Sequence, residues 1–233
     1  MKVPRSRRRG KSKIFQMNKF RAVGRARMIR ALEPMNARIV RFLHDSYRTA
    51  PLMEVKFENG ESTYLPAFVG AYVGKNVSYL KDDPVEDGQM RQLGGLPPGT
   101  DVYNIELKPR DGGKLVRAGG TSAKIVEKTG NLVTLSLPSG SMIKIEGECR
   151  AVVGRIANGG RVEKPFYKAG NMYHLIRARG RYWPMTAAVA MNAYEHKFGG
   201  KRRSTQHKAK TSSRRDPPGA KVGAISPRRT GQR

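Results

Sequence analysis

The sequence predicts a mainly β fold with two small barrels and long irregular basic extensions at both ends. Short β-like runs separated by turn signals fill the middle of the chain without helical patterns between them. Lysine and arginine concentrate at the two ends. A chain of 233 residues can hold one large or two small domains. We therefore expect a basic extension at 1–30, barrels at 31–100 and 101–160, and a glycine-rich basic extension at 161–233.

The charge distribution points to nucleic acid as the partner. The chain has a net charge of +28 and a pI near 10.8. Residues 1–30 carry 12 Lys/Arg and no acid, and residues 196–233 carry 12 Lys/Arg against the single Asp216. Such arms repel themselves until a counter-charge arrives. A membrane-surface helix at the N-terminus is the alternative, but its apolar residues form no sustained stripe, so we interpret this arm as threading into RNA.

The first barrel is predicted from runs at 39–43, 52–57, 62–68 and 69–79. Asn59-Gly60 supplies the turn of a hairpin between the second and third runs, because a two-residue turn needs positive φ. Acidic turns at 81–89 lead to Leu96-Pro97-Pro98-Gly99, which we take as the boundary. Closely spaced short strands favour an OB-fold.

The second barrel is predicted from runs at 102–107, 122–127, 131–137, 141–145 and 150–156, which suit an SH3-like barrel. Its expected core is Val102, Ile105, Leu107, Ile125, Val126, Leu132, Val133, Leu135, Met142, Ile145, Val152 and Val153. The wide turn at 108–114 and Arg117 place a basic cluster between two glycine pairs, which favours backbone–phosphate contacts.

Residues 161–203 combine cations, flat rings and glycines with almost no aliphatic periodicity. Phosphates require positive charge, exposed bases stack on rings, and glycine allows the backbone to come close. A polar surface loop is the alternative, but such long loops are uncommon in compact domains. We interpret this segment as the main binding segment.

The remaining composition argues against an enzyme, a secreted protein and a membrane protein. Cys149 alone allows no internal disulfide and suits a reducing compartment. No apolar run reaches membrane-spanning length, and the N-terminus lacks the apolar region of a secretory signal, so we expect a cytoplasmic location. The four histidines are scattered, which predicts no metal site, and we expect no cofactor.

Several motifs together resemble the universal large-subunit ribosomal protein L2 family, in its archaeal and eukaryotic branch. They are NIELKPRDGGKLVRAGG, LPSGS, CRAVVG, GGRVEKPFYKAGNMYH, VAMN, DPPGAKVGAIS and RRTG, and the similarity runs from about residue 38 to the end. The resemblance implies an OB-like and an SH3-like barrel with both termini extended into large-subunit rRNA. It also implies neighbouring ribosomal proteins, a small-subunit contact at the intersubunit bridge, and a glycine-rich loop approaching the peptidyl transferase centre, with no membrane and no homo-oligomer.

The resemblance and the basic segments together give the expected rRNA-binding residues. These are Arg7, Arg8, Arg9, Lys11, Lys108, Lys114, Arg117, Lys164, Lys168, Tyr173, His174, Arg177, Arg179, Trp183, Asn192, His196, Gly199, Gly200, Lys201, Arg202, Arg203, Arg214, Arg228 and Arg229. His196 falls on a family histidine discussed near the catalytic centre. We expect it to hydrogen-bond RNA rather than act as a general base, although imidazole titrates near neutrality.

The chain departs from the family pattern at Ala187-Ala188, where the family usually reads Arg-Gly, and at Ala193 and Lys201. The alanines raise helix propensity across 186–196, but we expect the irregular loop of the family there. The alternative function is a free-standing basic RNA chaperone or nucleic-acid-packaging protein. A ribosome-associated enzyme is a third hypothesis.

Overall fold

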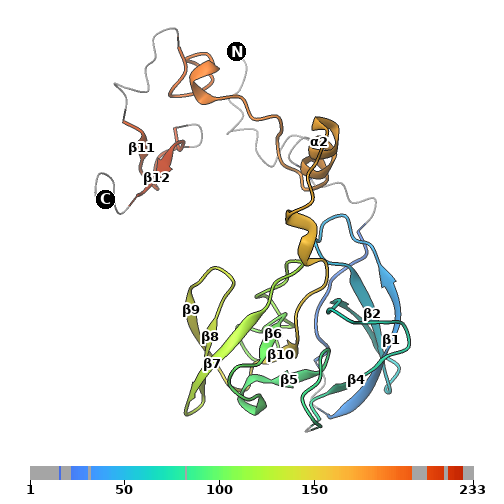
Figure 1. Cartoon of the computed structure of the whole chain (residues 1–233). Coiled ribbons are helices and arrows are strands. Elements are labelled where there is room, and N and C mark those ends of the chain that lie inside the picture. Colours follow the sequence, from blue (N-terminus) through green and yellow to red (C-terminus); the bar gives the residue numbers. More distant parts are fainter. Residues whose placement is uncertain are drawn as a thin grey trace. The chain divides into compact units, whose positions relative to one another are not determined.

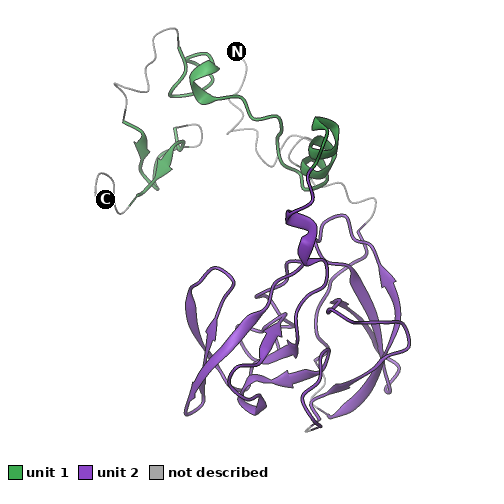
Figure 2. Ribbon diagram, in the orientation of Figure 1, with its two compact units in different colours: residues 1–19, 166–233 green, residues 20–165 purple. Residues whose placement is uncertain are grey.

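The computed structural model describes residues 16, 22–30, 33–81, 83–200, 209–217 and 220–227 (Figure 1). The chain divides into two units, one formed by residues 20–165 and the other by 1–19 and 166–233 (Figure 2). The unit at 20–165, purple in Figure 2, is β-rich, and the green unit contains the helix α2.

A ten-stranded sheet forms the unit at 20–165, with the order β3-β2-β1-β4-β5-β10-β6-β7-β8-β9. Its strands are β1 Met35–Leu43, β2 Leu52–Phe57, β3 Ser62–Pro66, β4 Asn76–Tyr79, β5 Met90–Gln92, β6 Asp101–Tyr103, β7 Ala123–Thr129, β8 Leu132–Ser136, β9 Met142–Glu146 and β10 Arg150–Val153. Neighbouring strands pair antiparallel except for β4 and β5, which pair parallel. The 3₁₀ helices η3 (Leu93–Gly95) and η4 (Gly159–Val162) belong to the same unit.

Two hydrophobic cores lie along this sheet, and the predicted mainly β fold is confirmed. β1 shows how the sequence creates the first core, because Met35, Ala37 and Ile39 are buried at alternate positions. The cores take residues from both sides of residue 100: Tyr103 packs in the first core and Leu93 in the second. All four residues of β10 are buried, since this strand lies between β5 and β6. The barrel boundaries stay a prediction.

The predicted hairpin at Asn59-Gly60 is confirmed, but its loop is longer than two residues. β2 and β3 pair antiparallel up to Lys56 and Ser62, and the amide of Phe57 donates to the carbonyl of Glu61 at 2.9 Å. Of the two turn residues, Gly60 alone adopts positive φ, at 85°. The loop between Phe57 and Glu61 has three residues, and a loop of this kind needs positive φ at one position only.

Several predicted strands are shorter than expected. The run at 69–79 forms a strand only at β4, because Gly70 and Gly74 adopt positive φ and turn the chain. The run at 102–107 ends at Tyr103, since Asn104 has φ of 49°. The three-residue strand β5 lies just after the turns predicted at 81–89 and was not expected.

Four residues predicted for the second core are exposed: Leu107, Val126, Leu132 and Met142. Val126 directly follows the buried Ile125 in β7, so the alternation of the strand places its side chain on the exposed face. Met142 begins β9 at the edge of the sheet, where the outer face meets solvent. The other predicted core residues are buried, although Val152 packs in the first core.

The unit at 1–19 and 166–233 contains α2 (Ala169–Ala178), η5 (Ala188–Ala190) and the short parallel strands β11 (Thr211–Ser212) and β12 (Ala224–Ile225). α2 was not expected in the irregular extension; Met172, Leu175 and Ile176 form its half-buried stripe at helical spacing. Over 186–196 the backbone contains only the 3₁₀ turn η5, so the predicted loop is confirmed. None of the described helices is both long and apolar enough to cross a membrane.

Candidate nucleic-acid interface

Residues 22–30, which we call the basic strap, lie across the β-rich unit with their cations outward. Ala26, Met28 and Ile29 are buried, whereas the side chains of Arg25 and Arg27 are exposed. Arg30 at the end of the strap is also exposed. An extended chain alternates its side chains, so the apolar residues anchor the strap while the arginines face outward. These arginines belong to the predicted basic arm but were not among the individual residues expected to bind rRNA. The alternation of Arg25, Ala26, Arg27 and Met28 was the signal that could have identified them.

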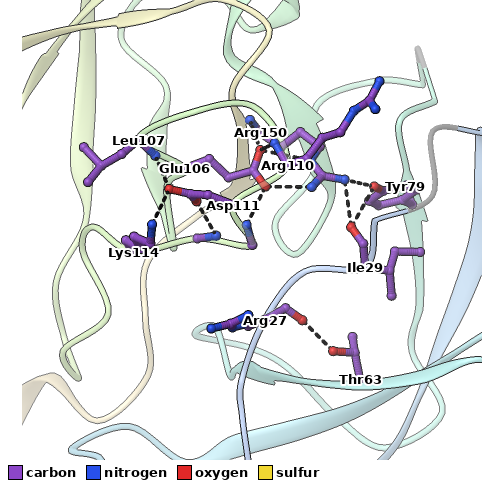
Figure 3. A network of polar contacts seen from close by, with 12 residues as sticks. Arg27, Ile29, Thr63, Tyr79, Glu106, Leu107, Arg110, Asp111, Lys114 and Arg150 are labelled. Carbon is purple, nitrogen blue, oxygen red and sulfur yellow. Dashed lines mark hydrogen bonds and ion pairs between the residues drawn. The ribbon is translucent and has the colours of Figure 1, made fainter.

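Side chains of the barrels hold the strap by its carbonyl oxygens. Arg48 Nη2 donates to Gly24 O at 3.0 Å, and Arg117 Nη2 donates to Ala26 O at 2.6 Å. The Thr63 hydroxyl donates to Arg27 O at 2.5 Å, as Figure 3 shows. The strap also donates one hydrogen bond to the barrels, from Met28 N to Gly112 O at 3.0 Å. The position of the outward arginines is therefore set by the barrels.

A buried ion pair between Glu106 and Arg150 also holds the strap (Figure 3). Arg150 Nη2 donates to Glu106 Oε1 at 2.6 Å and Nε donates to Oε2 at 3.0 Å. Arg150 Nη1 donates to the strap at Ile29 O, 2.8 Å away, and also to the Tyr79 hydroxyl. The pair thus joins β10, the segment after β6 and the strap. This pair, whose members lie 44 positions apart in the sequence, was not predicted.

The net effect on Glu106 is a lowered pKa. Burial by itself raises the pKa of this carboxyl, but the side-chain and backbone hydrogen bonds from Arg150 and the Gly112 amide lower it further than burial raises it. Glu106 Oε1 accepts from Gly112 N at 2.9 Å, and Oε2 accepts from Arg110 N at 3.3 Å. The ionised carboxylate therefore fixes the shape of the basic turn at 108–114.

This turn presents some of its predicted cations outward and uses another internally. Lys108 and Lys114 are exposed, and Lys114 Nζ lies 3.1 Å from Asp111 Oδ2. Arg117 is half-buried and bound to the strap, and its pKa is lowered by burial and then by the charges of Arg48 and Arg27. A cluster of like charges of this kind is relieved by a phosphate. Arg117 therefore positions the strap as well as contributing to its positive field.

In the unit at 1–19 and 166–233, the helix α2 brings three predicted residues together. Tyr173, His174 and Arg177 are all exposed. The Arg177 guanidinium carbon lies 5.8 Å from the centre of the Tyr173 ring, and Arg177 Nη1 donates to the Tyr173 hydroxyl at 3.2 Å. The rings of Tyr173 and His174 meet edge-on at 5.5 Å. α2 contains no acidic residue, so it offers flat rings and positive charge to a base and its phosphate.

The other predicted cations and rings around α2 are also accessible. Lys164 and Lys168 are exposed, and Arg179 and Trp183 are half-buried. The bond between Trp183 and Pro184 is cis. Lys164 belongs to the unit at 20–165 and therefore to a different unit from α2.

Residues 191–200 form a tight loop around His196. His196 Nδ1 accepts from Phe198 N at 3.1 Å, and His196 N donates to Asn192 O at 3.2 Å. Gly199 packs so closely that an added Cβ would lie 2.3 Å from Asn192 O. Burial lowers the pKa of His196. The neutral ring accepts at Nδ1, which leaves Nε2–H as a donor for a ligand.

The predicted Gly200 closes this loop through its amide, which donates to Met191 O at 3.1 Å. Arg214 is exposed in a turn. Outside the described residues lie Arg7, Arg8, Arg9, Lys11, Lys201, Arg202, Arg203, Arg228 and Arg229. Within the described ranges, no three histidine, cysteine or acidic side chains converge closely enough to hold a metal ion.

The sequence model of "Ribosomal Proteins L2, C-terminal domain" matches residues 86–221, which is more than half of the chain. The chain belongs to the ribosomal protein L2 family. Curated archaeal relatives agree with this assignment over nearly the whole length. The L2-family chain is 44% identical to a protein of Nanoarchaeum equitans, over 97% of this chain and 95% of the relative.

Two further relatives of the L2-family chain show similar identity. It is 42% identical to a protein of Methanocaldococcus jannaschii, over 99% of this chain and 92% of the relative. It is 43% identical to a protein of Hyperthermus butylicus, over 85% of this chain and 84% of the relative. All three relatives are named "Large ribosomal subunit protein uL2". The family resemblance expected from the motifs is thus confirmed.

Proposed function

We propose that this L2-family chain is a structural component of the large ribosomal subunit that binds large-subunit rRNA. The family assignment over nearly the whole chain carries the proposal. The strap, the basic turn and α2 support it, because each presents cations that internal carboxylates leave largely uncompensated. The protein acts by positioning and charge neutralisation, and the chemistry of translation is left to RNA.

The barrels dock as a preformed body and carry the strap to the rRNA. The carbonyls of the strap are held from within, so Arg25, Arg27 and Arg30 stay oriented toward solvent before any phosphate arrives. Preorganised cations lose less conformational freedom on binding than mobile ones. α2 adds a stacking surface through Tyr173 and His174.

The finer assignments extend the same proposal. The expected rRNA-binding residues contact large-subunit rRNA, and His196 donates a hydrogen bond to RNA from Nε2. The chain contacts neighbouring ribosomal proteins and the small subunit at the intersubunit bridge, and it supports the architecture of the peptidyl transferase centre without acting as an enzyme. Its location is the cytoplasmic ribosome.

The test is sedimentation followed by a salt wash. In a sucrose gradient of a cell lysate, the chain should co-sediment with the large subunit and remain bound after a high-salt wash. A free-standing RNA chaperone would instead remain near the top of the gradient and bind unrelated RNA equally well. That outcome would contradict the proposal.

The strap can be tested separately with purified chain and large-subunit rRNA. The variant R25Q/R27Q/R30Q should lower the magnitude of the slope of log affinity against log salt by about 2, since each neutralised phosphate contributes about 0.7 in a single strand. A matched variant, K124Q/K128Q/K144Q, removes equal charge from exposed positions on β7 and β9. It should change the slope by less than half as much. Equal changes in both variants would mean that the strap has no special role.

A further inference from the structure

An acidic pocket lies in the β-rich unit of this strongly basic chain. Its lining combines β1, β4 and the loop before β5, and its volume is about 280 Å³. Three exposed carboxylates, Asp83, Glu86 and Asp87, line it. Within the described ranges, none of the three forms an ion pair. A region of negative charge is unfavourable against RNA, so this part of the surface requires a different neighbour.

Two buried polar atoms at the pocket also have no partner. Gln89 is 6% exposed, and its Nε2 donates to Pro84 O at 2.8 Å, which leaves Oε1 without a hydrogen bond. The hydroxyl of Ser78 is likewise buried and unpartnered. Both residues line the pocket. An unsatisfied buried acceptor is costly, so a donor is expected to fill this place.

The chain's own nearby lysines are committed elsewhere. Lys75 Nζ donates to the main-chain carbonyl of Asp87 at 3.4 Å and lies 4.8 Å from the centre of the Phe68 ring. Lys81 Nζ donates to the Asn36 side-chain oxygen at 2.6 Å. The guanidinium of Arg91 likewise donates to a main-chain carbonyl, that of Asp83. Within the described ranges, none of these three cations forms an ion pair with the pocket carboxylates, so the carboxylates remain available to a cationic ligand.

The chemistry of the lining selects an organic cation with several N–H donors. The carboxylates and Gln89 Oε1 are acceptors spread over the pocket wall, and the described residues bring no three acidic, histidine or cysteine groups together tightly enough for a metal ion. A guanidinium carries five donors and an ammonium three, so either spans such a wall better than a compact metal ion.

A second hollow adjoins the pocket and gives a path for the chain that carries the cation. It has a volume of about 700 Å³ and shares Asn36 and Asn76 with the pocket. Its lining includes the exposed Val40 and Val73, the acidic Glu58, and the cations Arg38 and Lys56. An extended peptide can therefore place one basic side chain in the pocket and a less polar neighbour in the groove.

We propose that this acidic pocket binds an arginine or lysine side chain from a basic segment of another protein of the large subunit. The inference rests on the proposed function, since it takes the partner from the same particle. It gives the chain two kinds of binding surface: exposed cations for rRNA and an acidic pocket for a protein side chain.

The pocket is tested first with the purified full-length chain and a fluorescein-labelled Gly-Arg-Gly-Arg-Gly peptide at low ionic strength. Fluorescence anisotropy should show binding that the variant D83N/E86Q/D87N weakens about fivefold, as expected for the loss of several exposed ion pairs. The control E127Q/E146Q/E148Q changes the net charge equally at exposed positions of the second barrel. It should alter affinity less than about twofold if the pocket rather than the overall field binds the peptide.

Two results of this assay would overturn the proposal. Equal weakening by both triple variants would mean that the peptide senses only the general field. Displacement of the peptide by Mg²⁺ far more effectively than by Na⁺ at matched ionic strength would identify a divalent-cation site instead.

The second test uses purified large subunits and carbodiimide-driven labelling of carboxylates with glycine ethyl ester. Asp83, Glu86 and Asp87 should be labelled in the free chain and protected in the subunit, and carbodiimide alone should link them to a lysine of another protein where the partner supplies one. Full labelling within the subunit, or links only to lysines of this chain, would refute the proposal. Absence of the chain from the subunit would instead refute the proposed function.

Discussion

Replacing Arg150 by methionine removes the guanidinium that joins Glu106, Tyr79 and the strap. The side chains of Arg150 and Glu106 are 3% and 0% exposed, so water cannot replace the lost partner. Removing one member of a buried ion pair typically costs about 3–5 kcal/mol. Glu106 keeps its hydrogen bonds from the amides of Gly112 and residue 150. We therefore expect R150M to lower the free energy of unfolding by about 3 kcal/mol, near the low end of that range.

The double variant E106Q/R150M separates the charge effect from the packing effect. It leaves no charge at positions 106 and 150, and the amide oxygen introduced at position 106 can still accept from Gly112 N. We expect it to be less destabilised than R150M alone, by about 1–2 kcal/mol, because two contacting residues are not additive. The exposed pair of Arg41 and Glu54 gives a control, since R41M breaks an ion pair whose arginine is 60% exposed. Its effect should be much smaller.

The assay is urea unfolding of the full-length chain, followed by far-ultraviolet circular dichroism. The same variants should be examined by hydrogen exchange at the Met28 amide, which binds Gly112 O. R150M should speed this exchange, since it releases Ile29 O from the other end of the same strap. The reasoning is wrong if R150M unfolds at the same urea concentration as the native chain, or if the double variant is less stable than R150M.

Three further predictions concern single groups in the β-rich unit. The folded-state pKa of Glu106 is below its ordinary value of 4.5, so the carboxylate contributes fully to stability above pH 4.5 and loses this contribution as the pH falls through the lower folded value. E106Q should therefore flatten the acid side of a plot of urea midpoint against pH. Gly113 and Gly99 both have φ of 88°, but an added Cβ would meet Asn104 O at 2.6 Å at Gly113 and nothing within 4 Å at Gly99. G113A should therefore lower the thermal midpoint more than G99A, and equal shifts would exclude the contact as the cause. Burial first, and then nearby carboxylates led by Glu106, raise the pKa of Cys149 to about 12, so the thiol should resist a disulfide reagent at pH 8 until denaturant is added, and rapid reaction of the native chain would contradict this.

Local patterns in the sequence were enough to predict most strands of the sheet. The hairpin at Asn59-Gly60 depends on neighbours within a few residues, and it is found in the structure. The prediction was wrong at Val126, which the alternation of β7 turns outward next to the buried Ile125, and at 69–79, where turns interrupt an apolar run. α2 was missed because its stripe is short and half-buried.

The sequence predicted which types of residue form the candidate interface, but it did not predict the contacts that position them. Tyr173, His174 and Arg177 were selected as separate residues, and the helix brings them onto one accessible surface. Arg117 was selected for RNA, yet its side chain binds the strap at Ala26 O. The strap belongs to the basic arm that was predicted to bind RNA, but its arginines were not selected individually, because their exposure depends on which barrel residues hold the carbonyls between them.

The sequence by itself determined the charge of this protein, its basic ends, its β character and its family. These properties follow from composition and from periodicities of a few residues, which any stretch of chain carries within itself. Tertiary structure alone decided that Glu106 meets Arg150 across 44 positions, and that the strap turns its arginines outward. Such pairings form only when distant segments fold together and exclude water. A local sequence pattern does not indicate which distant residues will come into contact.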